Sequence, residues 1–90
     1  MKIKFFATYR AATGCRETTA PAPATVLALL QELSRRYPAL REKILNSDGT
    51  GLGQDAIVLI NGRNIVHLDG VATPLGETDT VALFPLVAGG

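Results

Sequence analysis

The segment from Thr25 to Pro38 constrains the fold most, because it forms the clearest amphipathic helix in the chain. Apolar side chains recur at helical spacing at Val26, Leu30 and Leu33, and polar residues occupy the opposite side. Thr25 is placed to cap the first turn, and Pro38 cannot continue the helix. One helix covers only one face of a sheet, so any sheet built from the rest of the chain keeps its other face partly open.

Short strand patterns flank this helix on both sides. A glycine-rich loop spans residues 46–54, and a weaker helical turn before it includes Leu40 and Ile44. Asn61-Gly62 is a strong hairpin-turn signal. The order strand, strand, helix, strand, short strand, strand predicts an α+β domain, a mixed sheet of four to five strands with one main helix packed on one face. The expected strands are residues 2–7, 17–20, 56–60, 64–67 and 80–84.

Size and composition narrow the class of protein. Ninety residues with 47% hydrophobic and 19% charged side chains make one globular domain, too apolar for a disordered chain. Such a small domain favours a binding module or carrier over an enzyme with a deep active site. The net charge of +1 without a basic run gives no electrostatic case for nucleic acid or membrane as a partner.

The remaining chemical candidates have simple structural interpretations. Cys15 is the only cysteine, so neither an internal disulfide nor a cysteine-based zinc cluster is expected, and no metal site is predicted. His67 has no grouped partner, and the loop from Gly49 to Gly53 lacks the Gly-Lys-Ser/Thr ending of a phosphate-binding loop. No 18-residue apolar segment occurs, so we expect a soluble cytoplasmic protein.

The most specific feature is the end of the chain, Gly89-Gly90, placed shortly after a strand that ends in Phe84-Pro85. Glycine lacks a Cβ, so a glycine tail can pass through a narrow channel to reach catalytic groups of another protein. Ala88 continues the run of small residues. The predicted organisation is therefore a domain over residues 1–85 and a flexible C-terminal tail over residues 86–90.

The ending Phe-Pro-x-Val-x-Gly-Gly resembles that of the small subunit of molybdopterin synthase, the MoaD family, whose members are ubiquitin-like sulfur carriers related to ThiS. The opening stretch 4–10 is similar to that family's first strand and the loop after it. Residues 58–65, 68–70 and 73–75 are similar to its middle hairpin. This resemblance implies the β-grasp (ubiquitin-like) fold, with the first and last strands side by side at the centre.

The resemblance also implies a function. The Gly90 carboxylate would be adenylated by a MoeB-like activating enzyme that uses ATP, and converted to a thiocarboxylate. The chain would then donate sulfur to the molybdopterin precursor in a MoaE-like large subunit, in molybdenum or tungsten cofactor synthesis. The chain itself would bind no cofactor and would not be catalytic alone, serving as a sulfur-donating accessory subunit. Gly89 and Gly90 are the expected reactive site.

An apolar collar at the root of the tail is the expected partner-binding surface. Phe84 is interpreted equally well as a partner anchor or as a core residue, and Phe6 fits the core better. Two other functions stay open. One is a ubiquitin-like modifier joined through Gly90 to lysines of target proteins. The other is a sulfur carrier for tRNA thiolation or thiamine. The collar consists of Phe84, Pro85, Leu86, Val87 and Ala88, with Phe6 beside it.

Overall fold

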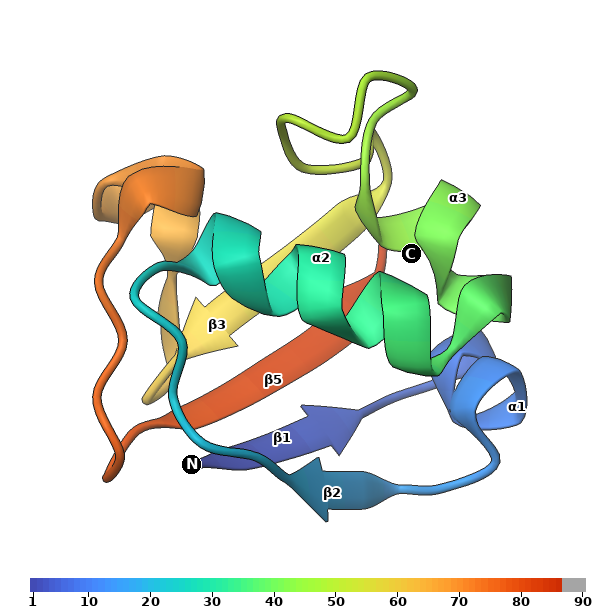
Figure 1. The fold of residues 1–90 in the computed structure, drawn as a ribbon, viewed down its shortest axis with the longest axis horizontal. Coiled ribbons are helices and arrows are strands. Elements are labelled where there is room, and N and C mark those ends of the chain that lie inside the picture. Colours follow the sequence, from blue (N-terminus) through green and yellow to red (C-terminus); the bar gives the residue numbers. More distant parts are fainter. Residues whose placement is uncertain (87–90) are drawn as a thin grey trace.

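A computed structural model of the chain describes residues 1–86 and shows a mixed sheet with helices on one of its faces (Figure 1). The sheet has five strands in the order β2-β1-β5-β3-β4. The expected mixed sheet is thus observed. Its strands are β1 (Lys2–Phe5), β2 (Glu17–Thr19), β3 (Ala56–Ile60), β4 (Arg63–Asn64) and β5 (Thr80–Pro85).

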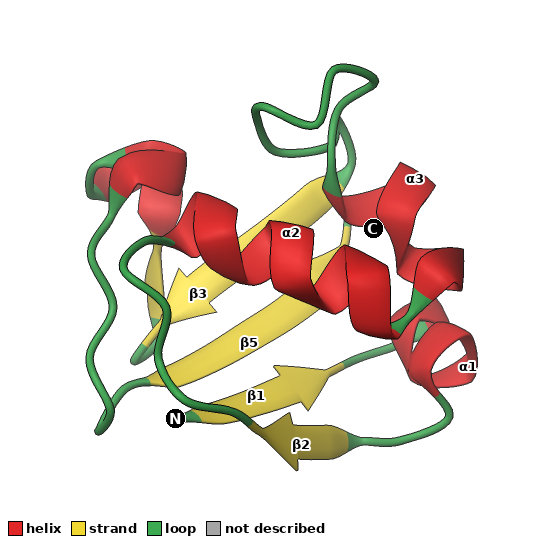
Figure 2. Cartoon of the chain, in the orientation of Figure 1, coloured by secondary structure: helices red, strands yellow, loops and turns green. Residues whose placement is uncertain are grey.

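The main helix, α2 (Val26–Arg36), crosses one face of the sheet, as Figures 1 and 2 show. The Thr25 hydroxyl accepts a hydrogen bond from the Ala28 N–H at 3.3 Å, so the expected N-cap is confirmed. Removing apolar side chains from water between helix and sheet is the main stabilising term of such a domain. The fully buried core side chains include Ile3, Phe5, Leu29, Leu30, Leu33, Val58, Val81 and Leu83.

The first and last strands lie side by side at the centre of the sheet. β1 runs parallel to β5, with Ile3 opposite Val81, and β5 runs antiparallel to β3. At the predicted hairpin turn, Asn61 has φ 51° and Gly62 has φ 84°. This is the left-handed conformation that Asn-Gly turns adopt between antiparallel strands.

The segment after the first strand differs from the prediction. β1 ends at Phe5 rather than at residue 7, and Ala7 has a positive φ of 53°. A short helix, α1 (Thr8–Thr13), follows where a loop was expected. Gly14 ends this helix in the left-handed conformation, and the Tyr9 ring beneath the helix is only 2% exposed. The helix brings Tyr9 into the core. The sequence does not reveal this, because the six residues of α1 are too few to show a helical period.

Three other strand boundaries differ, and the smallest difference is in β2, which ends at Thr19 and not at residue 20. The short strand expected at residues 64–67 is β4 (Arg63–Asn64), and the chain then turns into the 3-10 helix η2 (Ile65–His67), capped by the Asn64 side chain. A further 3-10 helix, η3 (Gly70–Ala72), follows. The last strand includes Pro85, which pairs with Ala56 at its end. A proline is tolerated there because strand ends need fewer ladder hydrogen bonds.

The region between α2 and β3 matches the expectation of helical turns followed by a loop. It contains the 3-10 helix η1 (Pro38–Leu40) and α3 (Arg41–Ile44), whose Ile44 is buried. In the loop, the Asn46 carboxamide oxygen accepts the N–H groups of Thr50 and Gly51 at 3.0 and 3.2 Å. Among residues 1–86, the structure contains no helix with the length and apolar character needed to cross a membrane.

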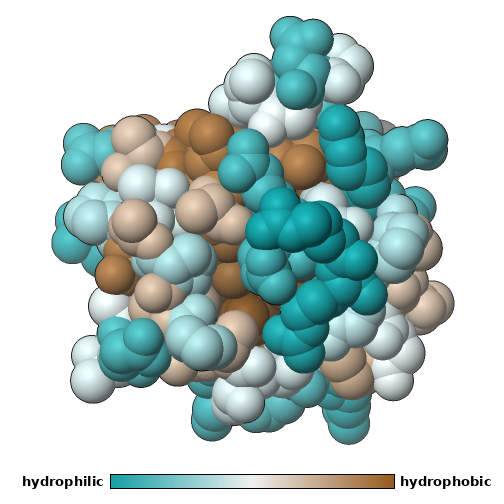
Figure 3. Space-filling view, in the orientation of Figure 1, coloured by the Kyte–Doolittle hydropathy of each residue, from teal (hydrophilic) through white to brown (hydrophobic). Residues whose placement is uncertain are grey.

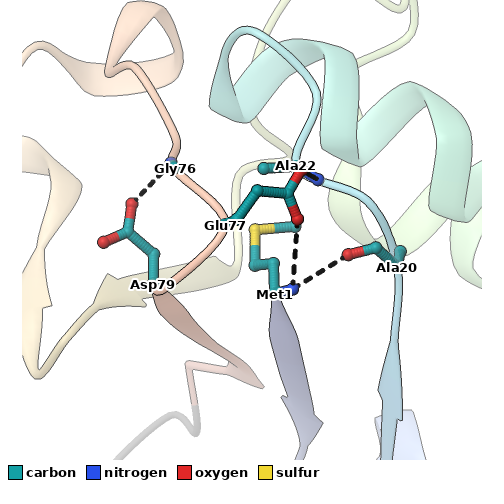
Figure 4. A network of polar contacts seen from close by, with 6 residues as sticks. All are labelled: Met1, Ala20, Ala22, Gly76, Glu77 and Asp79. Atoms are coloured by element: carbon teal, nitrogen blue, oxygen red, sulfur yellow. Dashed lines mark hydrogen bonds and ion pairs between the residues drawn. The ribbon is translucent and has the colours of Figure 1, made fainter.

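Carboxylates from the turn before β5 join several chain segments (Figure 4). Glu77 accepts the Ala22 N–H at 2.8 Å and lies 3.7 Å from the Met1 amine, which also donates to the Ala20 carbonyl. Asp79 accepts the Gly76 N–H at 2.8 Å. Its other oxygen accepts the Asn61 side-chain amide at 2.9 Å, so the β3–β4 turn is tied to the start of β5.

The two donors to Asp79, the Gly76 N–H and the Asn61 amide, make the stability of the domain depend on pH. The Gly76 N–H, and after it the Asn61 amide, hold the pKa of the Asp79 carboxyl below its ordinary value. A lowered folded-state pKa adds stability above the unfolded-state pKa of about 3.9, and this stability is lost as pH falls through the folded-state value. We expect Asp79→Asn to lower the free energy of unfolding at pH 7 and to have less effect in strong acid.

Urea unfolding of wild type and Asp79→Asn at pH 7 and in strong acid measures this difference. Asn61→Ala removes one of the two donors to Asp79. Its loss of stability should change less with pH than that of Asp79→Asn, because the Gly76 contact remains. A difference between wild type and Asp79→Asn that stays constant over this range would contradict the assignment.

Candidate functional site

An apolar depression lies on the face of the sheet that α2 leaves open, near the end of β5. Strand alternation creates it: Leu83 and Val58 point into the core, so their neighbours Phe84, Ala82 and Leu59 face the other way. The chain after β1 completes it. We call this surface the open-face patch; it is lined by Phe6, Ala7, Leu59, Ala82, Phe84 and Pro85.

Two aromatic rings dominate the open-face patch. Phe6 and Phe84 pack edge to face, with ring centroids 6.1 Å apart and planes at 87°. Both side chains are half-buried, and neither belongs to the hydrophobic core. The assignment of Phe6 to the core was therefore wrong: Ile3 and Phe5 point into the core, so alternation directs Phe6 to the outer face. For Phe84, the structure favours the surface position over the core.

Arg10 adds a cation beside these rings. Its Nε donates to the Phe5 carbonyl at 2.9 Å, and its guanidinium lies over the Phe6 ring, 5.2 Å from the centroid. Sequence reasoning did not single out Ala7, Leu59 or Ala82. Phe6 precedes α1, so the turn at Ala7, and not helical spacing, brings Arg10 over its ring.

The root of the expected tail is held to the domain. The Leu86 N–H donates to the Asp55 carbonyl at 2.6 Å, continuing the pairing of Pro85 with Ala56. The Leu86 side chain is 57% exposed. Val87, Ala88, Gly89 and Gly90 lie outside the residues that the structure describes, so their expected roles stay predictions.

A polar pocket borders this root, lined in part by Tyr9, Lys43, Asp55 and Leu86. The Tyr9 hydroxyl lies 3.4 Å from the Lys43 carbonyl, to which it donates. Burial, and secondarily the negative charge of Asp55, raises the pKa of the Tyr9 phenol. Tyr9 therefore stays a neutral donor at physiological pH, and its contact with Lys43 joins α1 to α3 near the start of the tail.

The other candidate residues lie apart from a shared site. The Cys15 thiol is half-buried, with its sulfur 3.9 Å from the Tyr37 hydroxyl. His67 is exposed at the end of η2. Within residues 1–86, no group of three or more His, Cys, Asp or Glu side chains is arranged to hold a metal ion. The described part of the site thus presents an apolar surface beside the start of the C-terminal segment.

Comparison with known proteins gives close relatives over the whole chain. The ThiS family model matches residues 3–90. The small archaeal modifier protein 3 of Haloferax volcanii is 39% identical, covering 100% of this chain and 98% of the relative. The molybdopterin synthase sulfur carrier subunit of Emericella nidulans is 30% identical, covering 99% and 96% respectively. The solution structure of small archaeal modifier protein 1 from Methanosarcina acetivorans superimposes with a TM-score of 0.86 at 36% identity, covering 99% of this chain and 94% of that one.

Parallel central strands, one helix across one face and this structural likeness define a ubiquitin-like domain of the β-grasp class. The predicted fold class is confirmed. The chain belongs to the ThiS family, and its fold is that of the ubiquitin-like sulfur carriers.

Proposed function

We propose that this chain is a sulfur carrier that acts through the carboxylate of Gly90, as the small subunit of molybdopterin synthase. The observation that carries the proposal is the family match, which runs through Gly89-Gly90. The relative from Emericella nidulans, named a molybdopterin synthase sulfur carrier subunit, supports the choice of recipient. The recipient would be the molybdopterin precursor, bound in a MoaE-like large subunit.

The chemistry requires activation of a poor acyl donor. A Gly90 carboxylate oxygen attacks the α-phosphate of ATP in a MoeB-like enzyme, forming an acyl-adenylate and releasing pyrophosphate. Hydrosulfide from a sulfur donor then attacks the acyl carbon and loses its proton, and AMP leaves with the carbon–oxygen bond electrons, which gives a thiocarboxylate. The chain supplies the acyl group; ATP and the catalytic groups belong to the activating enzyme.

The open-face patch supports this proposal as the docking surface for both enzymes. Phe6 and Phe84 present a half-buried aromatic pair on the open side of the sheet. Aromatic side chains are enriched among the residues that dominate binding energy at protein interfaces. β5 carries Phe84 and leads directly to the C-terminal segment, so docking here would bring Gly90 toward the partner's catalytic groups.

A second candidate function is a ubiquitin-like modifier joined through Gly90 to target lysines. The observation in its favour is the 39% identity to a protein named small archaeal modifier protein 3. Both functions begin with the same adenylate and differ in the nucleophile that follows, a sulfur donor or a lysine amine. Sulfur delivery to tRNA or to thiamine synthesis uses the same thiocarboxylate with another recipient.

Intact-mass spectrometry of the chain co-expressed with a MoeB-like enzyme, with and without a sulfur donor, tests the proposal. We expect one terminal oxygen of Gly90 to be replaced by sulfur. Because this change nearly equals the mass of an added oxygen, mapping of the C-terminal peptide must exclude oxidation of Met1 and Cys15. Linkage of Gly90 to lysines without a thiocarboxylate would favour the modifier, and an untouched Gly90 would refute both.

A further inference from the structure

A second binding surface lies on the side of the molecule that carries α2. We call it the β2–α2 groove; one wall is the segment 19–23, which starts at the last residue of β2, and the other is the side of α2 that faces this segment. In Figure 3, apolar atoms lie at the bottom of a hollow bordered by hydrophilic side chains over α2. The α2 wall is formed by Ala28, Leu29, Glu32, Arg35 and Arg36.

The groove follows an unpaired sheet edge. β2 is the outermost strand beside β1. The Phe5 N–H donates to the Arg16 carbonyl, and the Ala20 N–H donates to the Met1 carbonyl. Hydrogen-bonded pairs alternate along an antiparallel ladder, so Thr18, midway between Arg16 and Ala20, also bonds toward β1. The alternate residues Glu17 and Thr19 therefore direct their backbone N–H and C=O groups away from the sheet. Such an edge is a template for an added strand.

A fixed positive charge stands beside this edge. The Arg36 guanidinium donates to the Thr18 hydroxyl at 3.2 Å and lies over the Tyr37 ring, 5.3 Å from the centroid. The salt bridges within residues 1–86 join other groups, such as Arg35 with Glu32, and Arg36 has no acidic partner there. Neutral contacts thus hold the guanidinium in place while its charge stays uncompensated, which suits a carboxylate from outside.

We propose that the β2–α2 groove binds an extended acidic peptide segment of a partner protein. The segment adds a strand to β2, places an apolar side chain between residues 19–23 and α2, and pairs a carboxylate with Arg36. A second copy of this chain fits less well. Twofold pairing of two β2 strands would bring two Arg36 guanidinium groups together at Thr18, and like charges repel.

The groove and the open-face patch lie on different elements. The groove uses the β2 edge and the helix face, whereas the patch lies on the face that α2 leaves open. The proposal is thus independent of the sulfur-carrier function: a peptide held in the groove leaves Phe6 and Phe84 free for another partner.

NMR titration of the isotope-labelled full chain tests this proposal. The probes are capped eight-residue peptides that alternate Val or Ile with Thr and carry two Asp residues at one end or the other. We expect amide shifts at Glu17, Thr19, Ala20 and Ala22, since Pro21 and Pro23 carry no N–H, and we expect the affinity to fall as salt rises. Arg36→Gln should weaken binding by about tenfold, because it removes a charge-assisted hydrogen bond. Arg63→Gln, on the opposite sheet edge, is the matched control and should bind like wild type.

Two peptide controls separate strand addition from charge attraction. Replacing Asp by Lys in the peptide should abolish binding. N-methylation of every second peptide residue can start at an odd or an even position, and only one of these two sets should abolish binding, because only one set of peptide N–H groups faces β2. The proposal is overturned if no peptide shifts these amides, if the Lys peptides bind equally, or if the shifts centre on Phe84. Concentration-dependent shifts at β2 without peptide would also overturn it, in favour of self-association.

Discussion

Deletion of Gly90 is expected to abolish sulfur loading and sulfur transfer completely while the domain stays folded. The adenylate and the thiocarboxylate both form on the terminal carboxyl carbon, and after deletion that carbon belongs to Gly89, one residue short. Proximity governs such steps, so a misplaced acyl group loses most of its reactivity. Removing a terminal residue has little effect on stability. Mass mapping of the C-terminal peptide after incubation with the activating enzyme measures the loss.

Gly76→Ala is a matched control for this deletion, because it also alters a glycine. An added Cβ at Gly76 would meet only Asp79 Oδ2 at 3.7 Å, an ordinary contact, so full sulfur loading is expected. Thermal unfolding of the wild type, the Gly90 deletion and Gly76→Ala verifies that the three proteins fold equally well. If the shortened chain still received and delivered sulfur, Gly90 would not be the reactive residue. The deletion tests the step shared by carrier and modifier, and the mass experiment separates these two functions.

The sequence was most informative where local pattern and packing agree. The Thr25 cap, the helix that follows it, the apolar run at 56–60 and the Asn61-Gly62 turn were each predicted and are present. In these segments the period of apolar residues or the turn chemistry leaves one favourable structure. The adjacency of β1 and β5 came from the family resemblance alone, since periodicity does not specify which strands pair.

The site was harder to predict because it depends on the pairing of distant strands and on one backbone turn. Alternation from Ile3 directs Phe5 into the core and Phe6 to the other face, but the sequence does not show which residues of another strand lie beside Phe6. The positive φ of 53° is at Ala7, where no glycine marks it in the sequence. The parallel register of β1 and β5, with Phe5 opposite Leu83, places Phe6 against Phe84, and the turn at Ala7 starts the helix that carries Arg10. Phe6, Phe84 and Pro85 were expected at a partner-binding surface, whereas Ala7, Leu59 and Ala82 join them only through the folded structure.

Replacement of Phe84 by alanine is expected to weaken binding to the large synthase subunit by about thirtyfold or more, equivalent to about 2 kcal/mol. The Phe84 ring is half-buried beside Phe6 and outside the core, so its loss should lower the free energy of unfolding by only about 1–2 kcal/mol. Isothermal titration calorimetry with the purified large subunit measures the affinity, and urea unfolding measures the stability.

Leu83→Ala gives the opposite pattern and is the matched control. Leu83 precedes Phe84 on β5 but is fully buried beneath α2, so truncation should cost about 2–5 kcal/mol of stability. The folded fraction of this variant should bind the large subunit like wild type, because its open-face patch is unchanged. If both variants lost affinity equally, the loss would reflect general damage to β5. If Phe84→Ala bound normally, the patch would not be the docking surface, and the contact with the synthase would have to lie elsewhere on the chain.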